Sequence, residues 1–161
     1  MVREYQEEYF SRIGVVVDTS VPSADRLEAM LSLAAGVVAH LARGEALIDL
    51  LVAGDRVHDL TLGRHLGFLE QALDLLACVE ARARPLAADA VLGVLSPHLP
   101  RLSCVIVVTS TGDGGALAER IRGFGVGCTT LVVLGDGPEA RGRDVRSIRA
   151  SAIAAGEALS L

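Results

Sequence analysis

Asp18, Thr19 and Ser20 directly follow an apolar, β-branched run at residues 13–17. A buried strand that ends in an aspartate, with a hydroxyl two residues further on, offers the hard oxygen ligands that Mg²⁺ prefers. The same residue types also cap helices and close loops through their own hydrogen bonds. The motif is therefore compatible with a cation site, and the pattern by itself favours the structural role.

A second polar loop, Thr109–Asp113, follows another apolar run and leads through Gly114 and Gly115 into a predicted helix. The amide groups at a helix start could receive a phosphate. However, the loop has no GxGxxG pattern, and Asp113 would repel a phosphate. A flexible turn explains the glycines better than a phosphate cradle does.

The histidines offer a weaker candidate site. His58 and His65 lie near Asp55 and Asp59 in the sequence, and a hydrolytic metal centre would need two or three such side chains to converge. Because these residues fall on a predicted edge hairpin, solvated positions are the favoured interpretation. His40 falls at the end of a predicted helix, where a basic group is favourable.

The composition excludes several kinds of chemistry. All 15 basic residues are arginine, so no lysine is present for a Walker A motif, a Schiff base or a lysine-dependent phosphatase. Ser20 and Ser110 lack the GxSxG setting of a serine nucleophile. The net charge of −5 and the aromatic content of 3% argue against a nucleic-acid partner.

The length of 161 residues suits one domain with a full core. No apolar stretch approaches the roughly 20 residues that cross a bilayer, so no transmembrane segment is predicted. Cys78, Cys104 and Cys128 are widely spaced and form neither a CxxC pair nor a metal-ligand pattern. They are interpreted as small buried residues of a reducing compartment.

Hydrophobic periodicity predicts strands that alternate with helices, and therefore an α/β sandwich with a mostly parallel sheet. A capping box at Asp25 and Glu28 is expected to start the first helix, and a two-residue turn at Gly54 and Asp55 predicts an antiparallel hairpin. The expected strands are 13–17, 46–52, 56–60, 104–108 and 127–134, and the expected helices are 25–44, 66–79, 86–95, 116–122 and 145–159.

The opening of the chain resembles one known family. Residues 2–8 read VREYQEE, and residues 15–20 read VVVDTS after a short spacer. This "VRE-aromatic-xEE" segment, followed by a strand ending in "D-x-S", resembles the C-terminal part of the bacterial family called domain of unknown function 58. The later order of elements agrees with the same family, so the resemblance spans nearly the whole chain, although only the opening motif is specific.

The resemblance implies a Rossmann-like, von Willebrand factor A-like three-layer sandwich with an antiparallel edge strand. It further implies a connecting segment at 1–12 and the domain at 13–161, excised from a longer protein. Members of that family are commonly membrane-anchored, and their genes often lie beside one for a MoxR-type AAA+ ATPase. The implied location is a cytoplasmic domain of a parent protein at the inner membrane.

The adhesion site of von Willebrand factor A domains gives a residue-level expectation. Its D-x-S-x-S motif matches Asp18 and Ser20, whereas Pro22 stands at the third position. Thr61 is the candidate for the threonine of the site, and Ser110 stands where an aspartate is expected. Since Pro22 offers no side-chain oxygen and Ser110 no charge, the resemblance implies a degenerate site with weakly bound Mg²⁺ or none.

Three functional hypotheses follow. The first is a non-catalytic interaction domain whose loops at Thr19 and Asp113 bind a protein partner, with the MoxR-type ATPase implied by the resemblance. The alternative is a Mg²⁺-dependent phosphatase-like hydrolase, with Asp18 as nucleophile or ligand and Asp113 as its helper. The third is a domain that forms a homodimer through an exposed apolar helix face.

Overall fold

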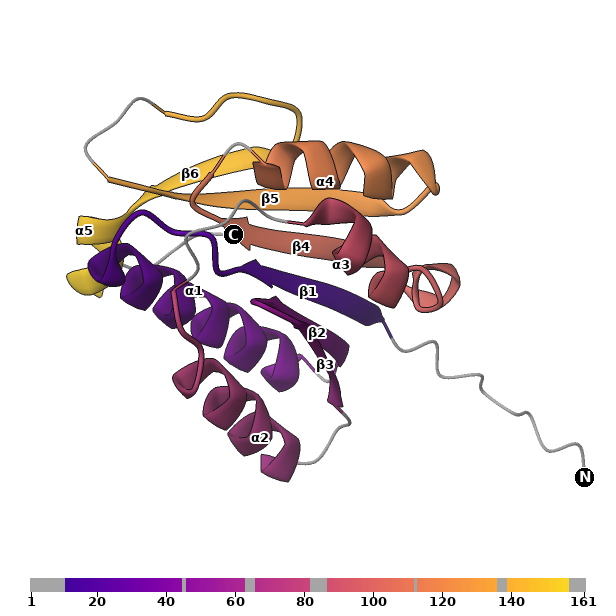
Figure 1. Ribbon diagram of the computed structural model, residues 1–161. Helices are drawn as coiled ribbons and strands as arrows, with labels where there is room; N and C mark the ends of the chain where they lie inside the picture. The colour runs from indigo at the N-terminus through magenta and orange to yellow at the C-terminus, as the bar shows by residue number, and fades with distance from the viewer. Residues whose placement is uncertain are drawn as a thin grey trace, which may run out of the picture.

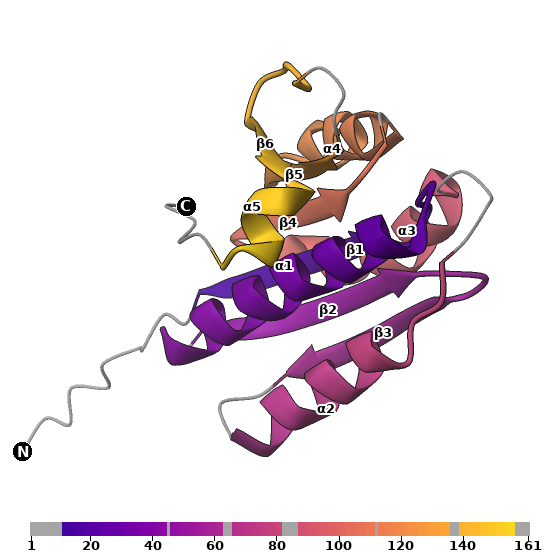
Figure 2. The same ribbon diagram turned by 90° about the vertical axis from the view of Figure 1, so that its left-hand side faces the viewer.

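The computed structural model describes residues 11–44, 46–62, 66–81, 87–111, 113–135 and 139–156. Six strands form one sheet in the order β3-β2-β1-β4-β5-β6. Helices cover both faces of this sheet, as Figures 1 and 2 show, so the molecule is a three-layer α/β sandwich. The expected fold class is therefore confirmed.

The four inner strands are the apolar runs of the sequence, because both of their faces are covered. The central strand β1 (Arg12–Asp18) pairs in parallel with β2 (Leu47–Ala53) and with β4 (Cys104–Thr109). Beyond β4 the sheet continues in parallel through β5 (Gly127–Leu134) and β6 (Val145–Arg149). β3 (Val57–Leu62) is the antiparallel edge strand, as expected.

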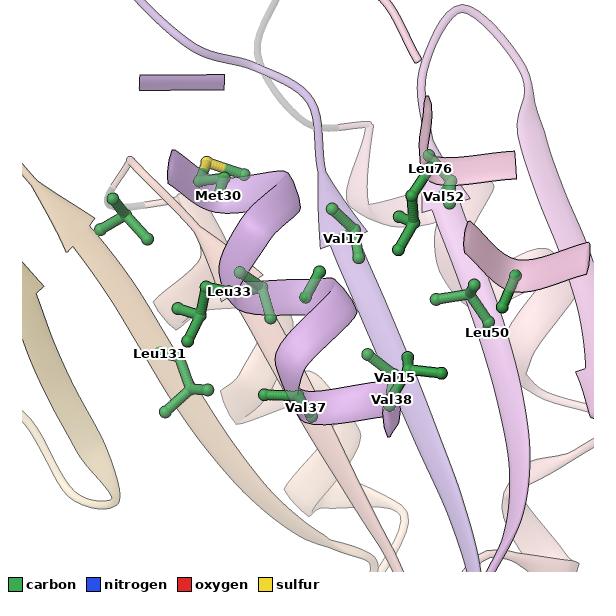
Figure 3. Packing of buried hydrophobic residues seen from close by; sticks show 14 of the residues in the cluster. Val15, Val17, Met30, Leu33, Val37, Val38, Leu50, Val52, Leu76 and Leu131 are labelled. Carbon is green, nitrogen blue, oxygen red and sulfur yellow. The ribbon is translucent and has the colours of Figure 1, made fainter. Parts of the chain in front are cut away.

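One face of the sheet is covered by α1 (Ala24–Arg43), α2 (Leu66–Ala77) and the short α5 (Ala150–Ala154). Met30, Leu33, Val37 and Val38 of α1 point toward the strands in Figure 3 and pack in one cluster with β1. These residues recur every three or four positions, which is the spacing that puts an apolar stripe on one side of a helix. Burial of that stripe holds α1 across the sheet.

The opposite face is covered by α3 (Ala88–Leu95), the 3₁₀ turn η1 (Leu99–Arg101) and α4 (Asp113–Gly123). Val16 of β1 and Val107 of β4 belong to this second cluster, together with Leu117 and Ile121 of α4. Neighbouring residues of one strand thus serve different clusters, because successive side chains of a strand point to opposite faces.

Four local predictions need correction. The expected helix at 145–159 is β6 followed by α5, because residues 145–149 find a free strand edge at β5 that no local pattern reveals. The helix N-cap is Ser23, whose hydroxyl accepts from the Arg26 amide, and not the Asp25 capping box. The β2–β3 loop has three residues, 54–56, and Cys78 is exposed rather than buried.

Candidate functional site

The topology places a candidate site between β1 and β4. The chain runs from β1 outward to β2 and β3 and later returns to add β4 on the other side of β1. Parallel sheets bind ligands beyond the carboxyl ends of their strands, at the point where the strand order reverses. Val17 pairs with Val108, so the next residues, Asp18 and Thr109, end their strands side by side at this point.

Asp18 is fully buried, and both of its carboxylate oxygens already accept hydrogen bonds. Oδ1 accepts from the backbone N–H of Ser20 at 2.9 Å. Oδ2 accepts from the hydroxyl of Thr109 at 2.8 Å and from that of Thr111 at 3.3 Å. The loops after β1 and β4 are therefore held together through one carboxylate, and such charge-assisted bonds are stronger than neutral ones.

Two further contacts complete what we call the carboxyl-edge cluster, which consists of Asp18, Ser20, Thr109, Ser110 and Thr111. The Ser110 hydroxyl donates to the carbonyl oxygen of Ser20 at 3.1 Å, and the backbone N–H of Thr111 donates to the Thr109 hydroxyl at 3.1 Å. The structure thus brings together three of the four residues expected at a cation site. Thr109 and Thr111 were missed, although they lie in the loop that the sequence singled out.

Thr61 does not join this cluster. It lies on antiparallel β3 opposite Asp49, near the amino end of β2, and its hydroxyl donates to Asp49 Oδ1 at 2.7 Å. Because β3 runs antiparallel to β2, its later residues lie at the opposite edge of the sheet from Asp18. The antiparallel hairpin predicted from the sequence already implied this separation, whereas only the resemblance placed Thr61 at the adhesion site.

Thr19 and Asp113 were expected on partner-binding loops, and the structure describes the side chain of Thr19 alone. Thr19 is fully buried, and its hydroxyl donates to the carbonyl oxygen of Ala53 at 2.9 Å, so its side chain belongs to the fold and is not available to a partner. Asp113 begins α4, and its side chain lies outside the described residues. Pro22, which replaces a hydroxyl of the adhesion motif, is exposed in the loop before α1.

The cluster does not fit a divalent cation well. Asp18 is its single carboxylate, and among the residues that the structure describes no group of three or more His, Cys, Asp or Glu side chains could hold a metal. A cation at Asp18 would have to displace the Thr109 and Thr111 hydroxyls from Oδ2. A divalent ion needs about six oxygen ligands, whereas this carboxylate is already satisfied by its own chain.

Gly114 and Gly115 lie in the first turn of α4 and not in a flexible turn, and Gly114 serves packing. A Cβ placed on Gly114 would overlap the Thr109 side chain, so only glycine lets the start of α4 approach β4 this closely. This contact positions Thr109 toward Asp18. Gly112, which the phosphate hypothesis also used, lies outside the described residues.

The histidines considered as metal ligands do not form a metal centre in the described part of the chain. Asp55 and His58 line a cavity of about 310 Å³ together with Cys78 and Glu80, near the end of α2. These four side chains do not form a metal-binding group within the described part of the chain. His65 lies outside it, whereas His40 falls in the last turn of α1, as expected.

A second polar cluster, missed in the sequence, centres on Asp49 at the amino edge of the sheet. Its carboxylate accepts from Arg12 Nε at 2.7 Å and Nη2 at 2.8 Å, as well as from Thr61, and lies 3.2 Å from His98 Nδ1. Burial alone would raise the pKa of Asp49, but the bonds from Arg12 and Thr61 outweigh it and hold that pKa below its usual range. The signal was an aspartate inside the otherwise apolar strand β2.

The six-stranded, mostly parallel sheet with its antiparallel edge strand is the von Willebrand factor A-like architecture that was expected. No family model matches the sequence, and no curated protein matches it. Within the described residues, no helix combines the length and the apolar character needed to cross a membrane.

Two solved structures align with this chain at low sequence identity. One is the conserved hypothetical protein BatB from Bacteroides thetaiotaomicron, with a TM-score of 0.53 and 12% identity over 76% of this chain and 66% of that chain. Another is an aerotolerance-related membrane protein from Bacteroides fragilis, with multiple mutations to serines. Its TM-score is 0.46 and its identity 13%, over 76% of this chain and 66% of that chain. The aligned region spans just under two thirds of each neighbour, and the likeness to BatB shows the fold alone.

Proposed function

We propose that this chain is a non-catalytic interaction domain that binds a protein partner through the loops at the carboxyl edge of its sheet. The proposal rests on the burial and the hydrogen bonding of the Asp18 carboxylate. Its carboxylate is fully buried, and donors from three residues of the same chain occupy it. A group in this state orders the loops around it and does not present itself to a substrate.

The same observation weighs against the phosphatase-like alternative. A nucleophilic aspartate needs an open approach to phosphorus, and phosphate needs a cation or a basic side chain beside it. Asp18 has no exposed surface, and the chain has no lysine. Asp18 therefore lacks the setting that a nucleophile in this reaction requires.

The homodimer hypothesis has little support in the described surface. The large apolar side chains exposed there are Leu73 on α2 and Phe124 after α4. These two helices cover opposite faces of the sheet, so the two side chains do not form one apolar patch. A binding surface built from polar loops fits the structure better.

The identity of the partner rests on the sequence resemblance to the domain of unknown function 58 family. We propose a divergent member of that family, in which the chain belongs to a larger membrane-associated protein and acts with a MoxR-type AAA+ ATPase. We further propose that binding needs no divalent cation, because the hydroxyls of Thr109 and Thr111 satisfy Asp18 in its place.

Partner binding is tested by interferometry with the purified MoxR-type ATPase and two matched variants. Pro22 is exposed near the carboxyl edge, and Phe124 is exposed after α4, at the opposite end of the sheet. Pro22→Arg should weaken binding about tenfold, since a bulky charge then enters the interface, whereas Phe124→Arg should change it by less than about twofold. No binding by the unaltered chain, or a larger loss with Phe124→Arg, would refute the proposal.

Cation dependence and catalysis are tested separately. Calorimetric titration with Mg²⁺ and with Mn²⁺ should give no saturable heat. The ATPase should bind equally well with and without an added chelator. Saturable binding that disappears in Asp18→Ala would show a working cation site instead. Hydrolysis of p-nitrophenyl phosphate that needs Mg²⁺ and is lost in Asp18→Ala would establish the enzyme hypothesis.

A further inference from the structure

Arg26 occupies an unusual position at the carboxyl edge of the sheet. It lies in the first turn of α1, three residues after the N-cap Ser23. Its guanidinium lies directly against Gly135, which follows the last residue of β5. A Cβ placed on Gly135 would overlap Nη2 of Arg26 and lie 3.1 Å from its Cζ. Glycine therefore leaves the space that this guanidinium occupies.

The Arg26 guanidinium has no acceptor within the described part of the chain. Three described arginines are half-buried, namely Arg12, Arg26 and Arg122. Arg12 binds the Asp49 carboxylate, and Arg122 binds Glu119 and two backbone carbonyls. Arg26 contributes only its backbone N–H, to the Ser23 hydroxyl. The Arg26 nitrogens are not among the fully buried side-chain atoms without a partner, so they remain accessible to an acceptor from another molecule.

The helix itself makes this placement less favourable. The N-terminus of a helix carries partial positive charge, so a cation in the first turn is disfavoured there. α1 has 20 residues, and its other basic side chains, His40 and Arg43, lie in the favourable last turn. Neither helix capping nor the helix dipole therefore accounts for an arginine at this position.

We propose that Arg26 is an anion-recognition residue that binds a side-chain carboxylate from an acidic segment of a protein partner. The planar guanidinium can donate two parallel N–H bonds to a carboxylate, and it lies against Gly135 at the carboxyl edge of the sheet. The positive end of α1 adds to the attraction. This inference rests on the proposed function, since it names the chemistry that a partner brings to the carboxyl edge.

The surrounding charges favour a single carboxylate over a phosphate. Asp25 directly precedes Arg26 in the first turn of α1, and Glu28 follows two residues later. Both side chains are exposed and repel a dianion more strongly than a monoanion. A phosphate group is therefore the weaker ligand at this position.

The test is an NMR titration of the ¹⁵N-labelled full chain that follows the arginine Nε–Hε signals. The probe is a decapeptide of alternating glycine and glutamate, the matched control peptide contains glutamine, and inorganic phosphate is the third arm. The glutamate peptide should shift the Arg26 signal saturably, and the glutamine peptide should not. A response to phosphate but not to the glutamate peptide, or an equal shift at Arg43, would overturn the proposal.

Three variants distinguish the effect of the position of the Arg26 guanidinium from the effect of its charge. Arg26→Ala should lower affinity for the glutamate peptide about tenfold, and Gly135→Ala should lower it severalfold because the added methyl displaces the guanidinium without removing its charge. Arg43→Ala removes the same charge at the other end of α1 and should leave affinity unchanged. Amide spectra establish that each variant is folded. Unchanged affinity in folded Arg26→Ala would refute the site.

The two proposals fail in different ways. If the ATPase binds the unaltered chain and Arg26→Ala equally well, the interaction domain stands and the role of Arg26 is wrong. If the glutamate peptide binds at Arg26 while the ATPase does not bind, the acidic-segment site stands and the proposed partner is wrong.

Discussion

Removal of the Asp49 carboxylate should be one of the most damaging single changes at the amino edge of the sheet. Asp49 is 1% exposed and joins Arg12 of β1, Thr61 of β3 and His98 before η1. Asp49→Ala leaves the Arg12 guanidinium and the Thr61 hydroxyl without their acceptor. Removing one member of a buried ion pair costs about 3 to 5 kcal/mol.

The lower end of this range applies here, because the side chain of Arg12 is 18% exposed and regains some water. We therefore expect a loss of about 3 kcal/mol in the free energy of unfolding, equivalent to about 6 to 12 °C in Tm for a domain of this size. The assay is urea unfolding followed by circular dichroism, with an unchanged m-value as evidence that the compactness of both states is preserved.

The pH dependence gives the prediction a second, independent readout. The pKa of Asp49 is lower in the folded protein than its usual value. The unfolded carboxylate titrates at about 3.9, so the stabilisation is fully present above that pH and is lost as the pH falls through the folded pKa. The stability difference between the unaltered chain and Asp49→Ala should therefore shrink below about pH 4.

The matched control is Asp59→Ala, which removes an exposed carboxylate from neighbouring β3. It should cost less than about 0.5 kcal/mol. A loss below about 1 kcal/mol in Asp49→Ala, or a difference that does not change with pH, would refute the idea that this carboxylate holds the amino edge together.

Further predictions concern the packing of α4 and the reactivity of the cysteines. Gly114→Ala should lower the free energy of unfolding by about 1 to 3 kcal/mol, because its methyl overlaps Thr109, and Thr109→Ser should restore part of the loss in urea unfolding. Gly115→Ala, with open space around the added Cβ, should instead stabilise the helix by up to about 1 kcal/mol; equal losses in both variants would contradict the packing argument. Burial raises the pKa of the Cys128 thiol to about 12, whereas Cys78 is exposed. Iodoacetamide at pH 8 should therefore alkylate Cys78 rapidly and Cys128 only after unfolding, as measured by mass spectrometry. Rapid alkylation of folded Cys128 would contradict its burial.

The sequence by itself determined most of the element identities and the fold class. Apolar runs such as residues 104–108 predict buried strands, and apolar residues every three or four positions predict α1, because these patterns record local geometry. The same reasoning found the loops after β1 and β4, since polar residues that follow buried strands come at the edge of a sheet. Asp18 and Ser110 could be singled out on that basis.

Only the tertiary structure decided which side chains meet. Thr109 bonds Asp18 because β4, which comes much later in the chain, lies beside β1 in the sheet. Residues 145–149 form a strand because β5 leaves an edge for them to pair with. The contact of Arg26 with Gly135 likewise requires α1 to lie across the end of β5. Sequence patterns report the neighbours of a residue along the chain, whereas strand order and direction determine its neighbours across the sheet.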